Sequence, residues 1–210
     1  LRPLDSLTAQ PLPSTEGIMG FPFWSPDSRS LGFFAKDELR KLDLAGGAPQ
    51  TVCKLPLSGI MVFRGTWNRD GVILFSSLAG IHRVPATGGE PTLTLRSDQA
   101  ARYRWPVFLP DGRHFLVHRT PTQGAGEIQL AALDRQETTR LLAADSQARY
   151  ANGHLLFARA GALLAAPFDA SSLKLTGEPF VVADKVRVAG ELGRGYFSVS
   201  DNGSLAYDPN

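Results

Sequence analysis

The chain has 210 residues, of which 43% are hydrophobic and 20% are charged, and this composition is typical of a folded globular protein. A net charge of +2, without a run of Lys or Arg, argues against a nucleic-acid-binding surface, and no apolar stretch reaches the length of a membrane span. The single cysteine, Cys53, excludes an intramolecular disulfide framework.

One short motif recurs along the chain and predicts its organisation. A ring or apolar residue is followed by a turn that contains Asp or Asn, with Pro or Gly beside it, and the copies lie at 23–28, 67–71, 108–112, 150–153 and 197–203. Successive copies are 43, 41, 41 and 50 residues apart, counted at the Asp or Asn. Pro, Asp and Gly are the residues that tight turns require, so each copy predicts a β-hairpin. A period near this value is typical of a radial array of small sheets.

Four antiparallel strands are predicted in each repeat. The first strand ends at the motif, and the second leaves it at once, as at 31–35, 72–75 and 114–117. The third and fourth strands are joined by a second turn, at 45–47, 87–89 and 134–136, with a longer connection at 171–177. Complete repeats are predicted at 19–55, 63–95, 104–142 and 149–183.

The two ends of the chain predict complementary halves of one further repeat. Residues 195–208 contain a first and a second strand, and residues 1–12 contain two short strands. We therefore expect an all-β fold, a five-bladed β-propeller of four-stranded antiparallel blades, with residues 1–210 as one domain and the last blade closed from both termini. Such closure removes exposed sheet edges. The alternative is a piece of a larger ring of six to eight blades.

The Trp-Ser-Pro-Asp turn at 24–27, the strand at 33–35 and the turn at 42–47 together resemble the Pro-Asp repeat of TolB-type, WD-repeat-like propellers. The stretches 65–71, 108–115 and 175–180 resemble the propeller that follows the kinase domain in some bacterial serine/threonine kinases. This resemblance implies a sensor or protein-interaction module, and it favours a periplasmic or extracytoplasmic location over a cytoplasmic one. The chain has no kinase motif, so no catalytic residue is carried over.

No catalytic, cofactor or metal site is predicted. His114 and His118 lie four residues apart on a predicted strand, which places them about 13 Å apart, too far to share one zinc ion. The turn acids Asp27, Asp70, Asp111 and Asp201 are interpreted as turn caps rather than as a metal ring. A Gly-x-Ser-x-Gly nucleophile elbow is absent from the sequence.

Arginines gather before or at the start of each predicted first strand. They are Arg64, Arg102, Arg104, Arg149, Arg187 and Arg194, whereas the first repeat has Glu16. One hypothesis is a positive rim around a channel mouth that holds a carboxylate or phosphate, with Arg64, Arg102, Arg104, Arg149 and Arg194 as ligand-binding residues. The other, which the sequence favours, is that they are solvated loop charges or pair with nearby acids such as Asp98, Asp145, Asp184 and Glu191.

The sequence thus predicts a non-catalytic module that binds a protein or peptide partner and is monomeric as an isolated domain. Tyr103, Arg104 and Trp105 are residue types that suit interface anchors. A small anionic ligand or a hydrolytic site in the central channel is the second hypothesis. A structural spacer is the third.

Overall fold

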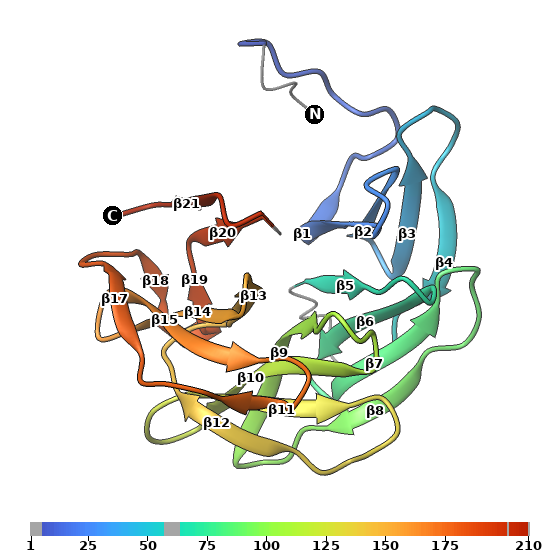
Figure 1. The fold of residues 1–210 in the computed structure, drawn as a ribbon. Helices are drawn as coiled ribbons and strands as arrows, with labels where there is room; N and C mark the ends of the chain where they lie inside the picture. The colour runs from blue at the N-terminus through green and yellow to red at the C-terminus, as the bar shows by residue number, and fades with distance from the viewer. Residues whose placement is uncertain (1–5, 57–63, 201, 210) are drawn as a thin grey trace.

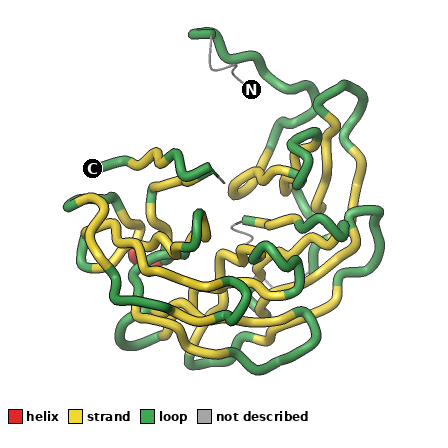
Figure 2. Tube along the Cα trace, viewed as in Figure 1, coloured by secondary structure: helices red, strands yellow, loops and turns green. Residues whose placement is uncertain are grey.

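The computed structural model describes residues 6–56, 64–200 and 202–209. These residues form strands joined by turns, together with one short 3-10 segment, η1 (Gly190–Leu192). Figure 2 shows strand in almost every part of the ring of sheets. The predicted all-β class is therefore confirmed.

Three sheets of the described chain are four-stranded and antiparallel, and in each the strands follow chain order. The first contains β1 (Ile18–Trp24), β2 (Ser30–Ala35), β3 (Glu38–Asp43) and β4 (Gln50–Lys54). The second contains β5 (Gly65–Trp67), β6 (Val72–Ser77), β7 (Gly80–Pro85) and β8 (Thr92–Arg96). The third contains β9 (Ala101–Phe108), β10 (His114–Pro121), β11 (Glu127–Ala132) and β12 (Thr139–Ala143).

The fourth sheet has an additional short strand. It contains β13 (Arg149–Ala151), β14 (His154–Arg159), β15 (Ala162–Asp169), β16 (Lys174–Leu175) and β17 (Phe180–Ala183), and both β16 and β17 pair with β15. Two hairpins follow, of β18 (Val188–Ala189) with β19 (Arg194–Gly195) and of β20 (Phe197–Val199) with β21 (Leu205–Tyr207). Figure 1 shows β1, β5, β13 and β19 near the middle of the ring and β4, β8, β12 and β17 at its rim.

The repeated turn forms as the sequence predicts. The Asp27 carboxylate accepts hydrogen bonds from the Ser25 hydroxyl at 2.6 Å and from the Arg29 N–H at 3.0 Å. In the third repeat Asp111 accepts the Arg113 N–H at 3.0 Å. These bonds cap each turn and hold the second strand antiparallel to the first. The turn acids at these two positions are structural.

Aromatic rings fill the space between neighbouring sheets. Phe34 of the first sheet lies 5.9 Å, between ring centroids, from both Phe23 and Phe75, and Phe75 belongs to the second sheet. All three rings are buried. Positions 32 and 65 require glycine, because a Cβ at either one would overlap the Phe23 ring. The sheets are therefore packed face to face around the ring, as in a propeller.

The closing sheet predicted from both termini is not confirmed. In the described chain β21 pairs only with β20, and residues 6–12 form no strand. Leu12 instead packs against Phe33, Ala35 and Leu42 on the first sheet, while Leu7 is 97% exposed. Figure 1 shows β21 on the open side of the ring. Burial of Leu12 on the face of the first sheet takes this segment away from the edge of β21.

Some predicted positions fall outside the described residues. They are residues 1–5 of the closing segment, residue 63 at the start of the second predicted repeat, and Asp201 of the fifth turn. The number of blades and the extent of the single domain stay predictions.

Candidate functional site

Three of the predicted arginines lie near the centre of the ring. Arg64 directly precedes β5, Arg149 begins β13, and Arg194 begins β19. The charge of Arg64 lowers the pKa of Arg149, and the charge of Arg194 lowers the pKa of Arg64. Arg64 thus lies close enough to repel both Arg149 and Arg194, and the three side chains come from different repeats. We call Arg64, Arg149 and Arg194 the axial arginines.

Burial affects the axial arginines more strongly than their mutual repulsion. It is the main cause that lowers the pKa of Arg64 to about 10 and the pKa of Arg149 well below its usual range. No ion pair joins any of the three to a carboxylate of the described residues, and Arg64 and Arg149 donate no side-chain hydrogen bond within that part of the chain. Desolvated cations without an acidic partner favour the approach of an anion.

Aromatic rings hold Arg194 in place. Its guanidinium carbon lies 3.7 Å from the centre of the Phe21 ring and 4.1 Å from the centre of the Tyr196 ring. Phe21 also lies 5.9 Å from Trp105, between ring centroids, and its backbone forms a parallel bridge with Arg64. Cation–π contacts of this kind fix a guanidinium and leave its N–H edges available.

Trp105 reaches this position through an unusual backbone conformation. Its φ is +55, in the left-handed region that bulky residues rarely adopt, and Pro106 follows it. The register between β9 and β10 shifts at this point, so a bulge interrupts β9. The buried indole Nε1 donates a hydrogen bond to the Leu192 carbonyl at 2.7 Å. A strained residue held this way is a common feature of binding sites.

Gln147 positions the strand that carries Arg194. Its buried amide donates to the Gly195 carbonyl at 2.9 Å and accepts the Gly195 N–H at 2.8 Å. Both ends of the amide are therefore used, and β19 is fixed against the segment that leads into β13. Arg149 and Arg194 lie on the two segments that this amide joins.

Two of the axial arginines, Arg64 and Arg194, line a cavity of about 330 Å³ near the centre of the ring, and Arg149 lies outside its lining. Its lining includes Phe21, Arg64, Trp105, Gln147, Arg194 and Tyr207. Cationic and aromatic groups make up most of this list, so the cavity suits an anion that also has apolar surface.

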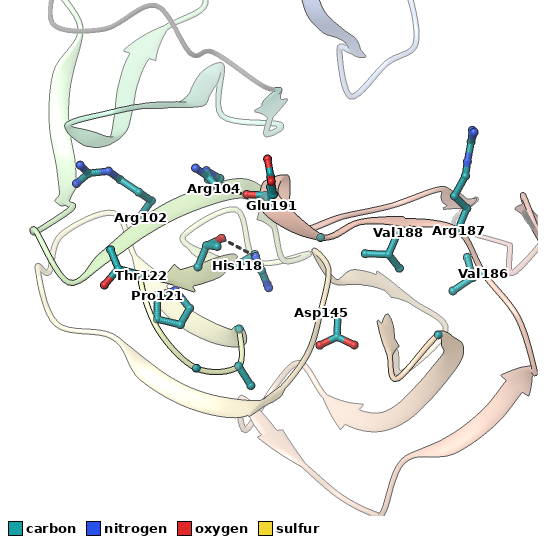
Figure 3. Close-up of a pocket in the computed structure, with 16 residues that line it drawn as sticks. Arg102, Arg104, His118, Pro121, Thr122, Asp145, Val186, Arg187, Val188 and Glu191 are labelled. Carbon is teal, nitrogen blue, oxygen red and sulfur yellow. Dashed lines mark hydrogen bonds between the residues drawn. The ribbon is translucent and has the colours of Figure 1, made fainter.

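Arg102 and Arg104 lie apart from the axial arginines, in a second pocket of about 880 Å³ that Figure 3 shows. Arg104 donates to the Glu191 carbonyl at 2.7 Å, and Arg102 donates to the Asp98 carbonyl at 2.6 Å. Backbone oxygens thus help to hold both side chains.

Arg187 reaches the edge of the same pocket. It forms an ion pair with Asp208 at 2.7 Å and stacks on Tyr196 at 3.8 Å from the ring centre. The predicted arginines are therefore divided between the centre of the ring and the second pocket.

His118 lines the second pocket but is occupied by structural contacts. It is buried, one ring nitrogen lies 3.0 Å from the Thr120 hydroxyl, and the other lies 3.0 Å from the Ala144 carbonyl. Burial lowers its pKa. His114 pairs with Asp111. Both histidines lie on β10, which confirms the predicted strand, and no group of three or more His, Cys, Asp or Glu in the described chain could hold a metal ion.

Two lining residues were not found by sequence reasoning. Phe21 takes, in the first sheet, the place that Arg64 takes in the second, as their backbone bridge shows. Phe21 precedes Trp24 by three residues, as Arg64 precedes Trp67, so the two positions correspond in the repeats, but a search for arginine passes over a phenylalanine. Gln147 has no motif, and only its contact with Gly195 reveals its role.

Comparisons with known proteins agree with the fold. Regucalcin from Agrobacterium tumefaciens, described as a calcium-binding protein, is similar with a TM-score of 0.66 and 21% identity, over 90% of this chain and 66% of that one. TolB from Acinetobacter baumannii gives 0.56 and 16%, over 71% and 40% of the two chains. A putative TolB from Agrobacterium tumefaciens gives 0.55 and 18%, over 89% and 78%.

These likenesses support a β-propeller fold, and at such identities they extend to the fold alone. The chain spans about two thirds of the regucalcin chain and two fifths of the Acinetobacter TolB chain. No protein-family model and no curated protein matches the sequence. Within the described residues, no helix is long and apolar enough to span a membrane.

Proposed function

We propose that this chain is a non-catalytic binding module that takes an anionic group of a protein or peptide partner at the axial arginines. The observation that carries the proposal is the convergence of three cations from three repeats without a carboxylate partner in the described chain. In keeping with the resemblance to kinase-associated propellers, the module would be the sensor part of a larger bacterial signalling protein.

The physical argument concerns the cost of burying charge. Removing a guanidinium from water costs several kcal/mol unless an opposite charge compensates it. At this site Arg149 and Arg64 pay that cost without an internal acid, so an external anion would recover part of it. Such arginines lower the stability of the free chain and raise its affinity for an anion.

A free small anion is the second candidate, and the size of the cavity favours it. About 330 Å³ is near the lower end of the range for small-ligand pockets. A hydrolytic role is less well supported, because the two histidines that contact a hydroxyl, His118 with Thr120 and His82 with Ser77, are themselves buried. Binding without chemistry is therefore the form of the proposal that we retain.

We also propose that the chain forms five repeats of one propeller. The hairpin of β20 and β21 follows the fourth sheet in the position of a fifth first-and-second strand pair. The fifth sheet would be completed by further strands beside β21. Amide hydrogen exchange tests this point, because a completed sheet would slow exchange at Leu205 and Tyr207.

Titration of the purified chain with glutarate, at constant ionic strength, tests anion binding. Trp105 borders the cavity, so its fluorescence reports binding, and the Trp105→Phe variant identifies the signal. We expect a saturable change in the parent chain that is lost in Arg149→Met. The matched control is Arg113→Met, which removes an exposed arginine paired with Asp134. An equal response in the parent chain and in Arg149→Met would contradict the proposal.

A further inference from the structure

Resting on the proposed function, we infer that the anionic group is the C-terminal carboxylate of a peptide whose last side chain is apolar. The inference depends on which hydrogen-bonding groups of the cavity are still available, and on what its walls are made of. Each of these can be assigned from the contacts around the axial arginines.

The available donors are guanidinium edges. Both faces of Arg194 lie against the rings of Phe21 and Tyr196, so only its N–H edges remain for a ligand. Arg64 is half-buried beside it, and it donates no side-chain hydrogen bond to the described residues. A guanidinium edge presents two parallel N–H groups, which match the two oxygens of a planar carboxylate.

Two polar side chains around these donors, those of Gln147 and Trp105, are already engaged. The Gln147 amide is used at both ends by Gly195, and the Trp105 indole N–H is used by Leu192. Their role is to position strands and rings rather than to contact a ligand. The charged donors of the cavity are therefore its arginines, beside the hydroxyls of Tyr196, Ser198 and Tyr207.

Acceptors for a ligand cation are scarce in the same cavity. Asp208 is the one carboxylate among the described residues that line it, and it is paired with Arg187 at 2.7 Å. The ammonium group of a free amino acid would thus approach Arg64 and Arg194, with only the already paired Asp208 to receive it. An acylated nitrogen, as in the last residue of a peptide, avoids this repulsion. The charge pattern therefore favours a peptide end over a free amino acid.

The walls of the cavity favour an apolar last side chain. Phe21, Trp105, Phe197 and Tyr207 all border it, and Tyr207 is 45% exposed. An apolar side chain that covers part of this surface contributes about 25 cal/mol for each Å² of apolar area removed from water. A bare inorganic anion gains only the charge interaction, so it should bind more weakly than a peptide that offers both groups.

The test compares peptides that differ only at their end. Acetyl-Gly-Gly-Phe with a free carboxylate and its C-terminal amide are titrated into the full chain by calorimetry, with phenyl phosphate and free phenylalanine as further probes. We expect the free-carboxylate peptide to bind at least tenfold more tightly than the other three. Arg149→Met should abolish its binding, and Arg64→Lys, which keeps the charge but loses the fork, should weaken it about tenfold. Arg113→Met should bind like the parent chain, and circular dichroism checks that each variant is folded.

The possible results separate this inference from the proposed function. Equal affinity for the acid and the amide would overturn the carboxylate inference, and so would preferred binding of phenyl phosphate or of free phenylalanine. In the last two cases the anion-binding function would stand. Binding of none of the four probes and of no glutarate would overturn both. Unchanged affinity in Arg149→Met and Arg64→Lys would move the site away from the axial arginines.

Discussion

Two regions of the molecule are built from the same repeats. One is the interface between the first and second sheets, the other is the centre of the ring, and they differ in the side chains that they bury. At the interface, Phe23, Phe34 and Phe75 are almost fully buried and contact one another. At the centre, Arg64 and Arg149 are partly buried without an acidic partner in the described chain. The comparison teaches that one part of each repeat stabilises the fold, while the inner strand ends carry groups that cost stability and serve recognition.

The interface should be the most sensitive part of the molecule. Phe75→Ala is expected to lower the free energy of unfolding by about 3–5 kcal/mol, because it removes a buried ring from between two sheets and leaves a cavity. Urea denaturation measures the change. Val181→Ala, at a position that is 55% exposed, is the control and should change it by less than about 0.5 kcal/mol. Similar effects of the two substitutions would contradict the packing described here.

A smaller loss is expected where a glycine makes room for the same interface. Gly65→Ala should destabilise the chain by about 1–3 kcal/mol, because the new methyl group would overlap the Phe23 ring. At Gly190 a Cβ would meet nothing within 4 Å and no positive φ is involved, so Gly190→Ala is the matched control. Denaturation curves of the two variants should differ clearly, and a neutral Gly65→Ala would mean that the ring of Phe23 lies elsewhere.

The centre of the ring should respond with the opposite sign. Arg149→Met is expected to raise the free energy of unfolding by about 1 kcal/mol or more in the absence of ligand, since an apolar side chain replaces a desolvated cation. The same substitution should remove anion binding. Urea denaturation with and without glutarate measures both effects. A destabilised Arg149→Met variant would indicate an internal partner for the guanidinium and would break the comparison.

A weaker, pH-dependent effect is expected from His118. Burial lowers its pKa in the folded chain, while the charges of Arg104, Asp145 and Glu127 act on it in both directions. Protonation is thus easier in the unfolded chain, so its stabilising contribution is complete above about pH 6.5 and declines as the pH falls towards the folded pKa. His118→Gln should flatten the loss of stability on acidification. An identical pH profile for this variant would show that other groups dominate.

Much of the fold could be predicted because it depends on local chemistry that repeats. The Asp-capped turns at Asp27 and Asp111 and the strands beside them follow from turn propensity and alternation. The path of residues 6–12 could not be predicted in the same way. This segment could pair with the edge of β21 or pack on the apolar face near Phe33, and tertiary packing decides between the two.

The candidate site was only partly visible in the sequence. Its arginines could be named from their recurrence, but their division into two groups depends on a register shift in β9 and on the left-handed backbone of Trp105. The insertion of Phe21 beside Arg64 comes from the way the first two sheets meet at the centre. The register shift and the conformation of Trp105 have no signal in the spacing of the repeats, whereas Phe21 lies three residues before Trp24, as Arg64 lies three residues before Trp67.

Arginine side-chain NMR tests the central claim most directly. The Nε–Hε signals of Arg64, Arg149 and Arg194 are assigned with single Arg→Lys variants and followed while glutarate is added at constant ionic strength. The account predicts saturable shifts for these three signals with one common affinity, and no shift for the exposed, acid-paired Arg113. Signals that stay unchanged, or that move together with Arg113, would contradict it.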